Sequence, residues 1–97
     1  MAAKIEWNKK ALEKLHNLIF NFKEHRPSYP DKFIKKIYEK LGQIEQFPEI
    51  GMPSKKKKTV RSVKIDARHR MYYRTKGKTI IVVYFFDSKQ HPDKNPY

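Results

Sequence analysis

The stretch TIIVVYFF, residues 79–86, decides the fold of this 97-residue chain. It is apolar at nearly every position, so a strand formed by it is buried on both faces, which predicts a central place in a sheet. Two further strands are predicted before it, at residues 59–65 and 70–75. The connections at 66–69 and 76–78 are short, so consecutive strands are expected to pair as antiparallel hairpins.

The N-terminal half is predicted to be helical. A short strand at residues 3–7 precedes a helix over 9–24, which Asn8 can cap. A second helix starts near Pro30 and ends before Pro48. Each helix has a single apolar face, because its apolar residues recur at helical spacing. We therefore expect one α+β domain over residues 1–97, in the order β-α-α-β-β-β, with a helical hairpin packed on one face of a small antiparallel sheet.

The composition excludes several classes of protein. There is no cysteine, so disulfides and cysteine-based metal sites are excluded. The four histidines lack the spacing of a metal site, and no metal or other cofactor is expected. No apolar run approaches the roughly 20 residues of a membrane helix, and the N-terminus has no signal-peptide pattern. We expect a cytoplasmic protein that does not associate with a membrane.

Positive charge is concentrated in one part of the chain. The net charge is +13, and the segment Lys55–Lys78 holds eleven basic residues and one acid. Such a field attracts a polyanion such as nucleic acid or an acidic protein. The residues expected to steer the chain to RNA are Lys55, Lys56, Lys57, Lys58 and Arg61. The alternative is that this lysine-rich segment is only a solvated surface.

The predicted strand at 70–75 has two different faces. Met71 and Tyr73 point to one side, toward the expected core under the helices. Arg70, Tyr72 and Arg74 point to the other. Arginine offers planar donors to phosphate, and tyrosine offers a stacking surface to an unpaired base. This pattern indicates a nucleic-acid-binding face, or alternatively a solvated outer face with an incidental tyrosine.

The segment HRMYYRTKGKTIIVVYFFDSKQHPDK, residues 69–94, resembles the end of RelE/ParE-type toxins. In many of these an R-x-x-Y strand leads through a tight turn into an apolar strand that ends in a pattern like FD-x-R-Q-x-P. The first strand ending in Trp7 and the FPEIG segment at 47–51 agree with the resemblance. It implies the toxin of a type II toxin–antitoxin pair, with an acidic antitoxin as partner. RelE-like members cut mRNA on the ribosome, whereas ParE-like members poison DNA gyrase.

The resemblance to RelE-like enzymes also implies a catalytic set. It maps onto Lys64, Arg70, Lys89 and Tyr97, which would surround the scissile phosphate and move a proton. Three departures are visible. Lys89 stands where arginine is usual, Ser62 stands where a second lysine is expected, and Tyr97 lacks a following helix to hold it. His91 is a further candidate for proton transfer, because histidine exchanges protons near neutral pH.

The sequence is compatible with three functions. The first is a metal-independent, ribosome-dependent mRNA endonuclease that uses the substrate's 2′-hydroxyl as nucleophile. The second is a non-catalytic inhibitor of DNA gyrase. The third is a basic nucleic-acid-binding module outside toxin–antitoxin biology. The polar residues 87–92 form either a functional tip at the end of the apolar strand or a simple exit loop.

Overall fold

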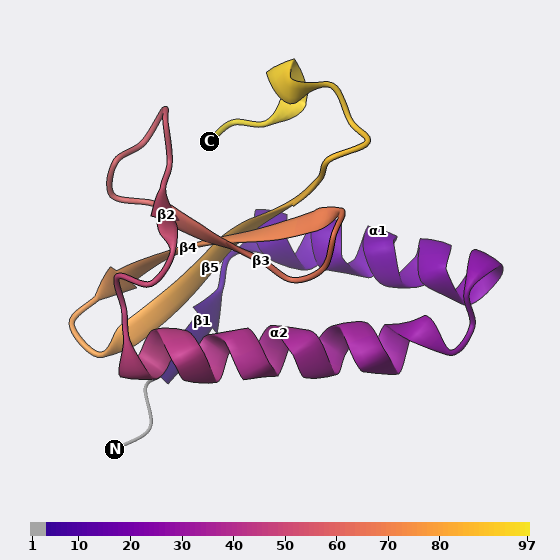
Figure 1. Cartoon of the computed structure of the whole chain (residues 1–97), viewed down its shortest axis with the longest axis horizontal. Coiled ribbons are helices and arrows are strands. Elements are labelled where there is room, and N and C mark those ends of the chain that lie inside the picture. Colours follow the sequence, from indigo (N-terminus) through magenta and orange to yellow (C-terminus); the bar gives the residue numbers. More distant parts are fainter. Residues whose placement is uncertain (1–3) are drawn as a thin grey trace.

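The computed structural model describes residues 4–97 and has the predicted α+β organisation (Figure 1). Its elements are β1 (Lys4–Trp7), α1 (Lys9–His25), α2 (Tyr29–Gln46), β2 (Met52–Pro53), β3 (Arg61–Lys64), β4 (His69–Lys76), β5 (Thr79–Asp87) and the 3₁₀ helix η1 (Pro92–Lys94). Two short elements were not predicted, namely β2 and η1. Residue 3, the first of the predicted N-terminal strand, lies outside the described residues.

The five strands form one sheet in the order β1-β5-β4-β3-β2. The predicted central position of β5 is confirmed, since it pairs with β1 on one side and β4 on the other. The β1–β5 pair is parallel, whereas the other pairs are antiparallel, so the sheet is mixed. A parallel pair needs a long crossover connection, and the helical hairpin is part of the chain that separates β1 from β5.

The helix starts follow local chemistry. The Asn8 side chain accepts a hydrogen bond from the backbone N–H of Ala11 at 2.8 Å, which confirms the predicted cap of α1. Pro30 lies in the first turn of α2, where its missing N–H has no cost.

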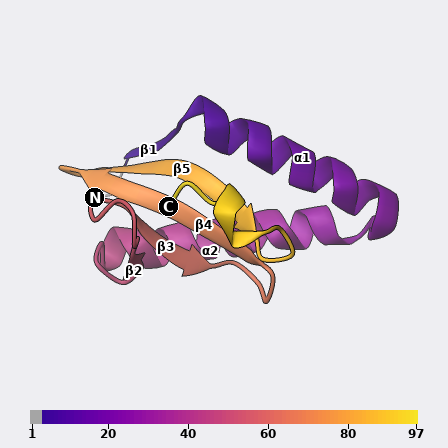
Figure 2. The same cartoon turned by 90° about the horizontal axis from the view of Figure 1, so that it is seen from above.

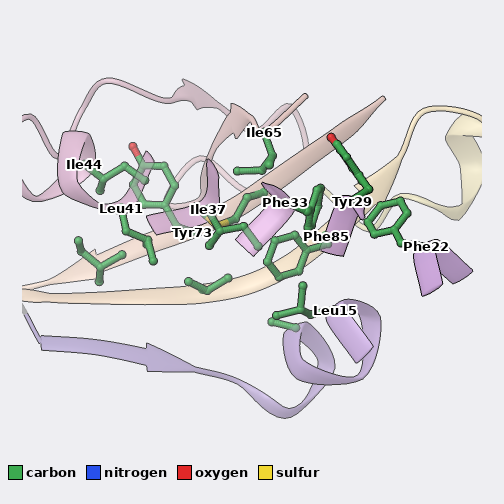
Figure 3. Packing of buried hydrophobic residues seen from close by; sticks show 14 residues of the cluster. Leu15, Phe22, Tyr29, Phe33, Ile37, Leu41, Ile44, Ile65, Tyr73 and Phe85 are labelled. Atoms are coloured by element: carbon green, nitrogen blue, oxygen red, sulfur yellow. The ribbon is translucent and has the colours of Figure 1, made fainter. Parts of the chain in front are cut away.

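Both helices cover the same face of the sheet, and their apolar sides meet it in one core (Figure 3). The core side chains Phe33, Ile37 and Ile44 of α2 are fully buried. Met71 and Tyr73 of β4 are fully buried as well, which confirms the face predicted for them.

A bulge in β5 changes which of its side chains reach this core. Tyr72 pairs with Tyr84 and Tyr73 pairs with Val82, so Val83 is an extra residue on β5. Val82 and Phe85 consequently both join the core under the helices, while Val83 and Tyr84 lie in a second apolar cluster. The bulge thus changes which face each β5 side chain after Val82 points to.

Candidate functional site

The face of the sheet that the helices leave uncovered carries the candidate site, and we call it the free face. Lys64 of β3 lies directly opposite Arg70 of β4, and Ser62 lies opposite Tyr72. The Arg70 guanidinium donates a hydrogen bond from Nη1 to Ser62 Oγ at 2.9 Å. Strand pairing therefore brings Lys64 and Arg70 together, and the hydrogen bond to Ser62 orients the Arg70 guanidinium.

Arg70 lines two pockets on the free face. The larger has a volume of about 350 Å³ and is also lined by Lys55, Lys56 and Tyr97, so we call it the Tyr97 pocket. The smaller has a volume of about 230 Å³ and includes Lys64, so we call it the Lys64 pocket. A phosphate group in either pocket would meet at least two cationic side chains, with Arg70 common to both.

The C-terminal segment crosses the free face (Figure 2), and its Tyr97 packs against the apolar cluster that contains Tyr72 and Tyr84. The Tyr97 ring stacks on the Tyr72 ring with centroids 5.3 Å apart, and it lies 5.8 Å from Tyr84. Asn95 Nδ2 donates to the Tyr72 hydroxyl at 2.8 Å. Tyr72 is left only 6% exposed, so Tyr97 forms the outer aromatic surface at the place where Tyr72 was predicted to stack a base.

The lysine-rich loop holds this segment in place. Lys56 Nζ donates to the Asn95 carbonyl oxygen at 2.6 Å, and Lys57 Nζ lies 5.0 Å from the centre of the Tyr97 ring. Ser54 Oγ donates to the Tyr97 carbonyl oxygen. Two of the four predicted RNA-steering lysines are therefore also structural contacts of the C-terminal segment.

A polar network lies beside the Lys64 pocket, where α2 begins. Asp66 accepts hydrogen bonds from the Tyr29 hydroxyl and from the backbone N–H groups of Arg68 and His69. Its carboxylate also lies 2.9 Å from Nδ1 of the buried His69. Burial alone would raise the pKa of Asp66, but these hydrogen bonds outweigh it and lower the pKa to about 2. Burial and the bond to Asp66 raise the pKa of Tyr29 to about 12.

A second carboxylate, Asp87, ties the end of β5 to this network. Its Oδ2 accepts from Arg68 Nη2 at 2.9 Å and lies 3.7 Å from His69 Nε2. Its Oδ1 accepts from the Lys89 backbone N–H at 2.9 Å. Burial acts to raise the pKa of Asp87, yet the bonds from Lys89 and Arg68 hold it below its usual value. The first residues after the apolar strand are therefore anchored by hydrogen bonds.

Nearly the whole chain matches a known family of toxins. The family model described as the ParE toxin of the type II toxin–antitoxin system parDE covers residues 5–92. The chain belongs to this ParE toxin family. Membership of this family excludes the third alternative, a nucleic-acid-binding module outside toxin–antitoxin biology. No significant match to a curated protein sequence was found.

Solved structures share the fold of this ParE-family toxin at low sequence identity. A YoeB/ParE toxin from Agrobacterium tumefaciens has 19% identity and a TM-score of 0.65, over 87% of this chain and 96% of that one. The YoeB–YefM complex from Staphylococcus aureus has 24% identity and a TM-score of 0.61, over 89% and 97%. The isolated RelE toxin of E. coli has 12% identity and a TM-score of 0.61, over 95% and 90%. The RelE/ParE-like fold predicted from the sequence is confirmed.

The candidate catalytic residues of this ParE-family toxin fall into two groups. Lys64, Arg70 and Tyr97 line the two adjoining pockets. Lys89 and His91 belong to the exposed segment after β5 and line neither of these pockets. His91 caps η1, and its Nδ1 accepts from the backbone N–H of Asp93 at 3.2 Å. Their roles in catalysis stay predictions.

The two predicted nucleic-acid-binding arginines, Arg61 and Arg74, lie on opposite faces of the sheet. Arg61 lies opposite Tyr73, on the helix-covered side, and its Nη1 donates to the carbonyl oxygens of Glu49 and Gly51. Arg74 lies on the free face opposite Ile81 and is exposed. Arg61 thus holds a loop, whereas Arg74 is open to a ligand.

Two groups that shape the site of this ParE-family toxin were not among the predicted site residues. Ser62 stands where a lysine is expected, and the predicted hairpin of the two strands was the signal that could have placed it beside Tyr72 and Arg70, as the structure does. Asn95 had no sequence signal, because its bond to Tyr72 joins residues 23 positions apart. Within residues 4–97, no cluster of three or more histidine, aspartate or glutamate side chains is arranged to hold a metal ion. No helix of the described part is long and apolar enough to cross a membrane.

Proposed function

We propose that this ParE-family toxin is a ribosome-dependent mRNA endonuclease that works without a metal. The observation that carries the proposal is the cross-strand pair of Lys64 and Arg70 on the free face, with Tyr97 lining the adjoining pocket. Two cations and a proton-exchanging hydroxyl around one open surface suit the cleavage of a phosphodiester.

The proposed reaction uses a nucleophile from the substrate. The 2′-hydroxyl of the RNA loses its proton and attacks the adjacent phosphorus, and the 5′-oxygen leaves with a proton, which yields a cyclic phosphate and a 5′-hydroxyl. Lys64 and Arg70 stabilise the extra charge of the phosphorane. Arg70 cannot act as a base, because its guanidinium stays protonated. Tyr97 or His91 takes up the proton of the 2′-hydroxyl and gives a proton to the leaving 5′-oxygen, and Lys89 adds charge from the loop after β5.

We also propose an acidic antitoxin as the partner that keeps the toxin silent. The family belongs to a type II toxin–antitoxin system, and the similar YoeB structure is a complex with YefM. The charge of +13 favours an acidic partner that covers the basic free face. An acidic segment that folds on binding, against the sheet and the helical hairpin, meets this need.

The alternative is a non-catalytic inhibitor of DNA gyrase. The name of the matching family model favours it, since ParE-like members act on gyrase. In that case Lys64 and Arg70 would be binding groups on a surface that contacts gyrase.

The deciding experiment measures both activities of the purified toxin. Cleavage of mRNA on ribosomes is followed by primer extension, and gyrase activity by DNA supercoiling. We expect mRNA cleavage by the wild type, no loss of supercoiling, and unchanged cleavage by toxin that is treated with a chelating agent and freed of it before the ribosomes are added. Inhibited supercoiling without mRNA cleavage would overturn the proposal in favour of the gyrase alternative.

A further inference from the structure

Three large apolar side chains are exposed along the short stretch of chain that leads from α2 to the edge strand β2. Phe47, Ile50 and Met52 are 60%, 49% and 63% exposed, within six consecutive residues. Phe47 follows the last turn of α2, and Met52 lies in β2, the outermost strand. We call these three residues the edge patch. Phe47 and Ile50 line one hollow of the surface, and Met52 lines the Tyr97 pocket. Large exposed apolar side chains so close along the chain point to an interaction surface that runs over this edge of the sheet.

The loop that presents the edge patch is rigid. The hydroxyl of the fully buried Tyr73 donates to the Pro48 carbonyl oxygen at 2.8 Å and accepts from the Gly51 N–H at 3.0 Å. Arg61 Nη1 donates to the carbonyl oxygens of Glu49 at 3.2 Å and Gly51 at 2.8 Å. The loop is thus fixed to β3 and β4 before any partner arrives. A surface ordered in advance loses little conformational entropy on binding.

The charges around the edge patch restrict what can cover it. The exposed Lys55–Lys58 run follows Met52 closely, while Glu45 and Glu49 are the exposed acids near Phe47. A second copy of this chain would bring another charge of +13 against these lysines, which disfavours self-association. RNA would satisfy the lysines but has no aliphatic side chains for Phe47 and Ile50. The patch fits a protein that combines apolar and acidic side chains.

We propose that the edge patch anchors the acidic antitoxin, an inference that rests on the proposed function for the identity of the partner. Apolar antitoxin side chains cover Phe47, Ile50 and Met52, and a neighbouring acidic run pairs with Lys55–Lys58. The antitoxin binds here through side chains rather than by adding a strand. The reason is that β2 has only two residues, and one of them, Pro53, has no N–H to donate.

This anchoring position also explains how the partner silences the site. Met52 lines the Tyr97 pocket together with Lys55, Lys56 and Arg70. A partner bound to Met52 and continuing over the lysines covers this pocket and withholds Arg70 from RNA. The edge patch therefore supplies apolar contact energy next to the cations that the antitoxin has to neutralise.

The test uses the 97-residue toxin and the purified product of the gene adjacent to its own, which the proposal requires to be the acidic antitoxin. Binding is measured by calorimetry for the wild type, for the triple variant Phe47→Ser, Ile50→Ser, Met52→Ser, and for a control, Phe20→Ser. Phe20 is 63% exposed on α1, far along the chain from the patch. We expect the triple variant to lose about 30-fold or more in affinity, the effect of losing a hot-spot side chain. The control changes one side chain of the helical hairpin, which the antitoxin also contacts, and should lose far less affinity.

Each other outcome overturns a stated part of the inference. Equal binding by the wild type and the triple variant would remove the patch as the anchor but leave the antitoxin as partner. A loss confined to Phe20→Ser would move the anchor to the helices. No binding by the wild type would overturn both the partner and the patch. If instead the wild type sediments with phosphatidylcholine–phosphatidylserine vesicles and the triple variant does not, the patch binds a lipid surface and the proposal fails. Circular dichroism melting shows whether each variant is folded.

Discussion

At the scale of single residues, Arg70 is the group on which the proposed chemistry depends most. It lines the Tyr97 pocket and the Lys64 pocket, and Ser62 holds its guanidinium. We expect Arg70→Ala to slow ribosome-dependent mRNA cleavage by about two to three decades, the scale of losing one transition-state donor. The matched control is Arg74→Ala, because Arg74 lies exposed on the same face and lines neither pocket. Equal losses of cleavage rate in the two variants would mean that Arg70 is only a general phosphate contact.

Tyr97 allows the hydroxyl group to be tested apart from the ring. In Tyr97→Phe the ring can keep its stack on Tyr72, so RNA binding and folding are expected to stay unchanged. Loss of the hydroxyl should lower the cleavage rate by about two to four decades if it transfers the proton. His91→Ala is measured alongside. A large loss in His91→Ala with none in Tyr97→Phe would assign the proton transfer to His91.

The pKa of Asp66 makes a prediction about stability. That pKa is about 2 in the folded chain, below its ordinary 3.8, so the folded state binds the proton more weakly than the unfolded state does. The stabilisation, about 2 kcal/mol, is present above pH 4 and is lost as the pH falls toward 2. We expect Asp66→Asn to lower the free energy of unfolding at pH 7 by a similar amount and to flatten its fall below pH 4. Urea denaturation across this pH range checks both, with the exposed Asp93→Asn as control.

The residues that sequence reasoning placed correctly were those whose position follows from strand alternation. Met71 and Tyr73 are buried under the helices, while Arg70 and Tyr72 lie on the opposite face, as the period of two requires. The cover over Tyr72 could not be predicted in the same way. It comes from Tyr97 and Asn95, whose contacts with β4 depend on the path of the segment after β5 rather than on any local pattern.

At the scale of elements, two glycines should respond in opposite ways to the same substitution. A Cβ at Gly51 would lie 2.7 Å from Cε1 and the hydroxyl oxygen of the buried Tyr73, so Gly51→Ala is expected to destabilise the fold by about 1–3 kcal/mol. A Cβ at Gly42, within α2, meets nothing within 4 Å. Gly42→Ala should therefore stabilise the fold by about 0.5–1 kcal/mol, because alanine favours a helix.

Chemical denaturation of the two variants and the wild type measures the free energy of unfolding, which should fall in Gly51→Ala and rise in Gly42→Ala. The Gly51→Ala variant should also lose amide protection at residues 49–51, since its side chain displaces the hydroxyl that binds the Pro48 carbonyl oxygen and the Gly51 N–H. If Gly51→Ala is as stable as the wild type, Tyr73 moves away without cost, and the loop that it holds is not rigid.

The elements that the sequence predicted are those with long, regular apolar patterns. The two helices and the three C-terminal strands needed only periodicity and turn residues. The two residues of β2 carry no such pattern, and they form a strand only because β3 lies beside them. The parallel pairing of β1 and the bulge in β5 were missed for a related reason, as both depend on which strands meet in space.

At the scale of the whole molecule, the uneven distribution of positive charge leads to a prediction about the salt dependence of RNA binding. The exposed run Lys55–Lys58 lies in the loop that contacts the C-terminal segment, next to the Tyr97 pocket. If these lysines bind phosphates, changing all four to glutamine should weaken binding to single-stranded RNA of any sequence. It should also reduce the slope of log affinity against log salt by up to about 3, since each phosphate contact contributes about 0.7.

The control for this variant removes the same charge from the helix-covered side. It changes Lys9, Lys23, Lys32 and Lys35, which are exposed on α1 and α2. Both variants have a net charge of +9 by the same count, so a general attraction of RNA to a basic protein would reduce the two salt slopes equally. A loss of slope confined to the Lys55–Lys58 variant would locate the RNA on the free face. An unchanged slope in that variant would mean that the run is a solvated loop, and that RNA held by Lys64 and Arg70 does not extend across the Tyr97 pocket.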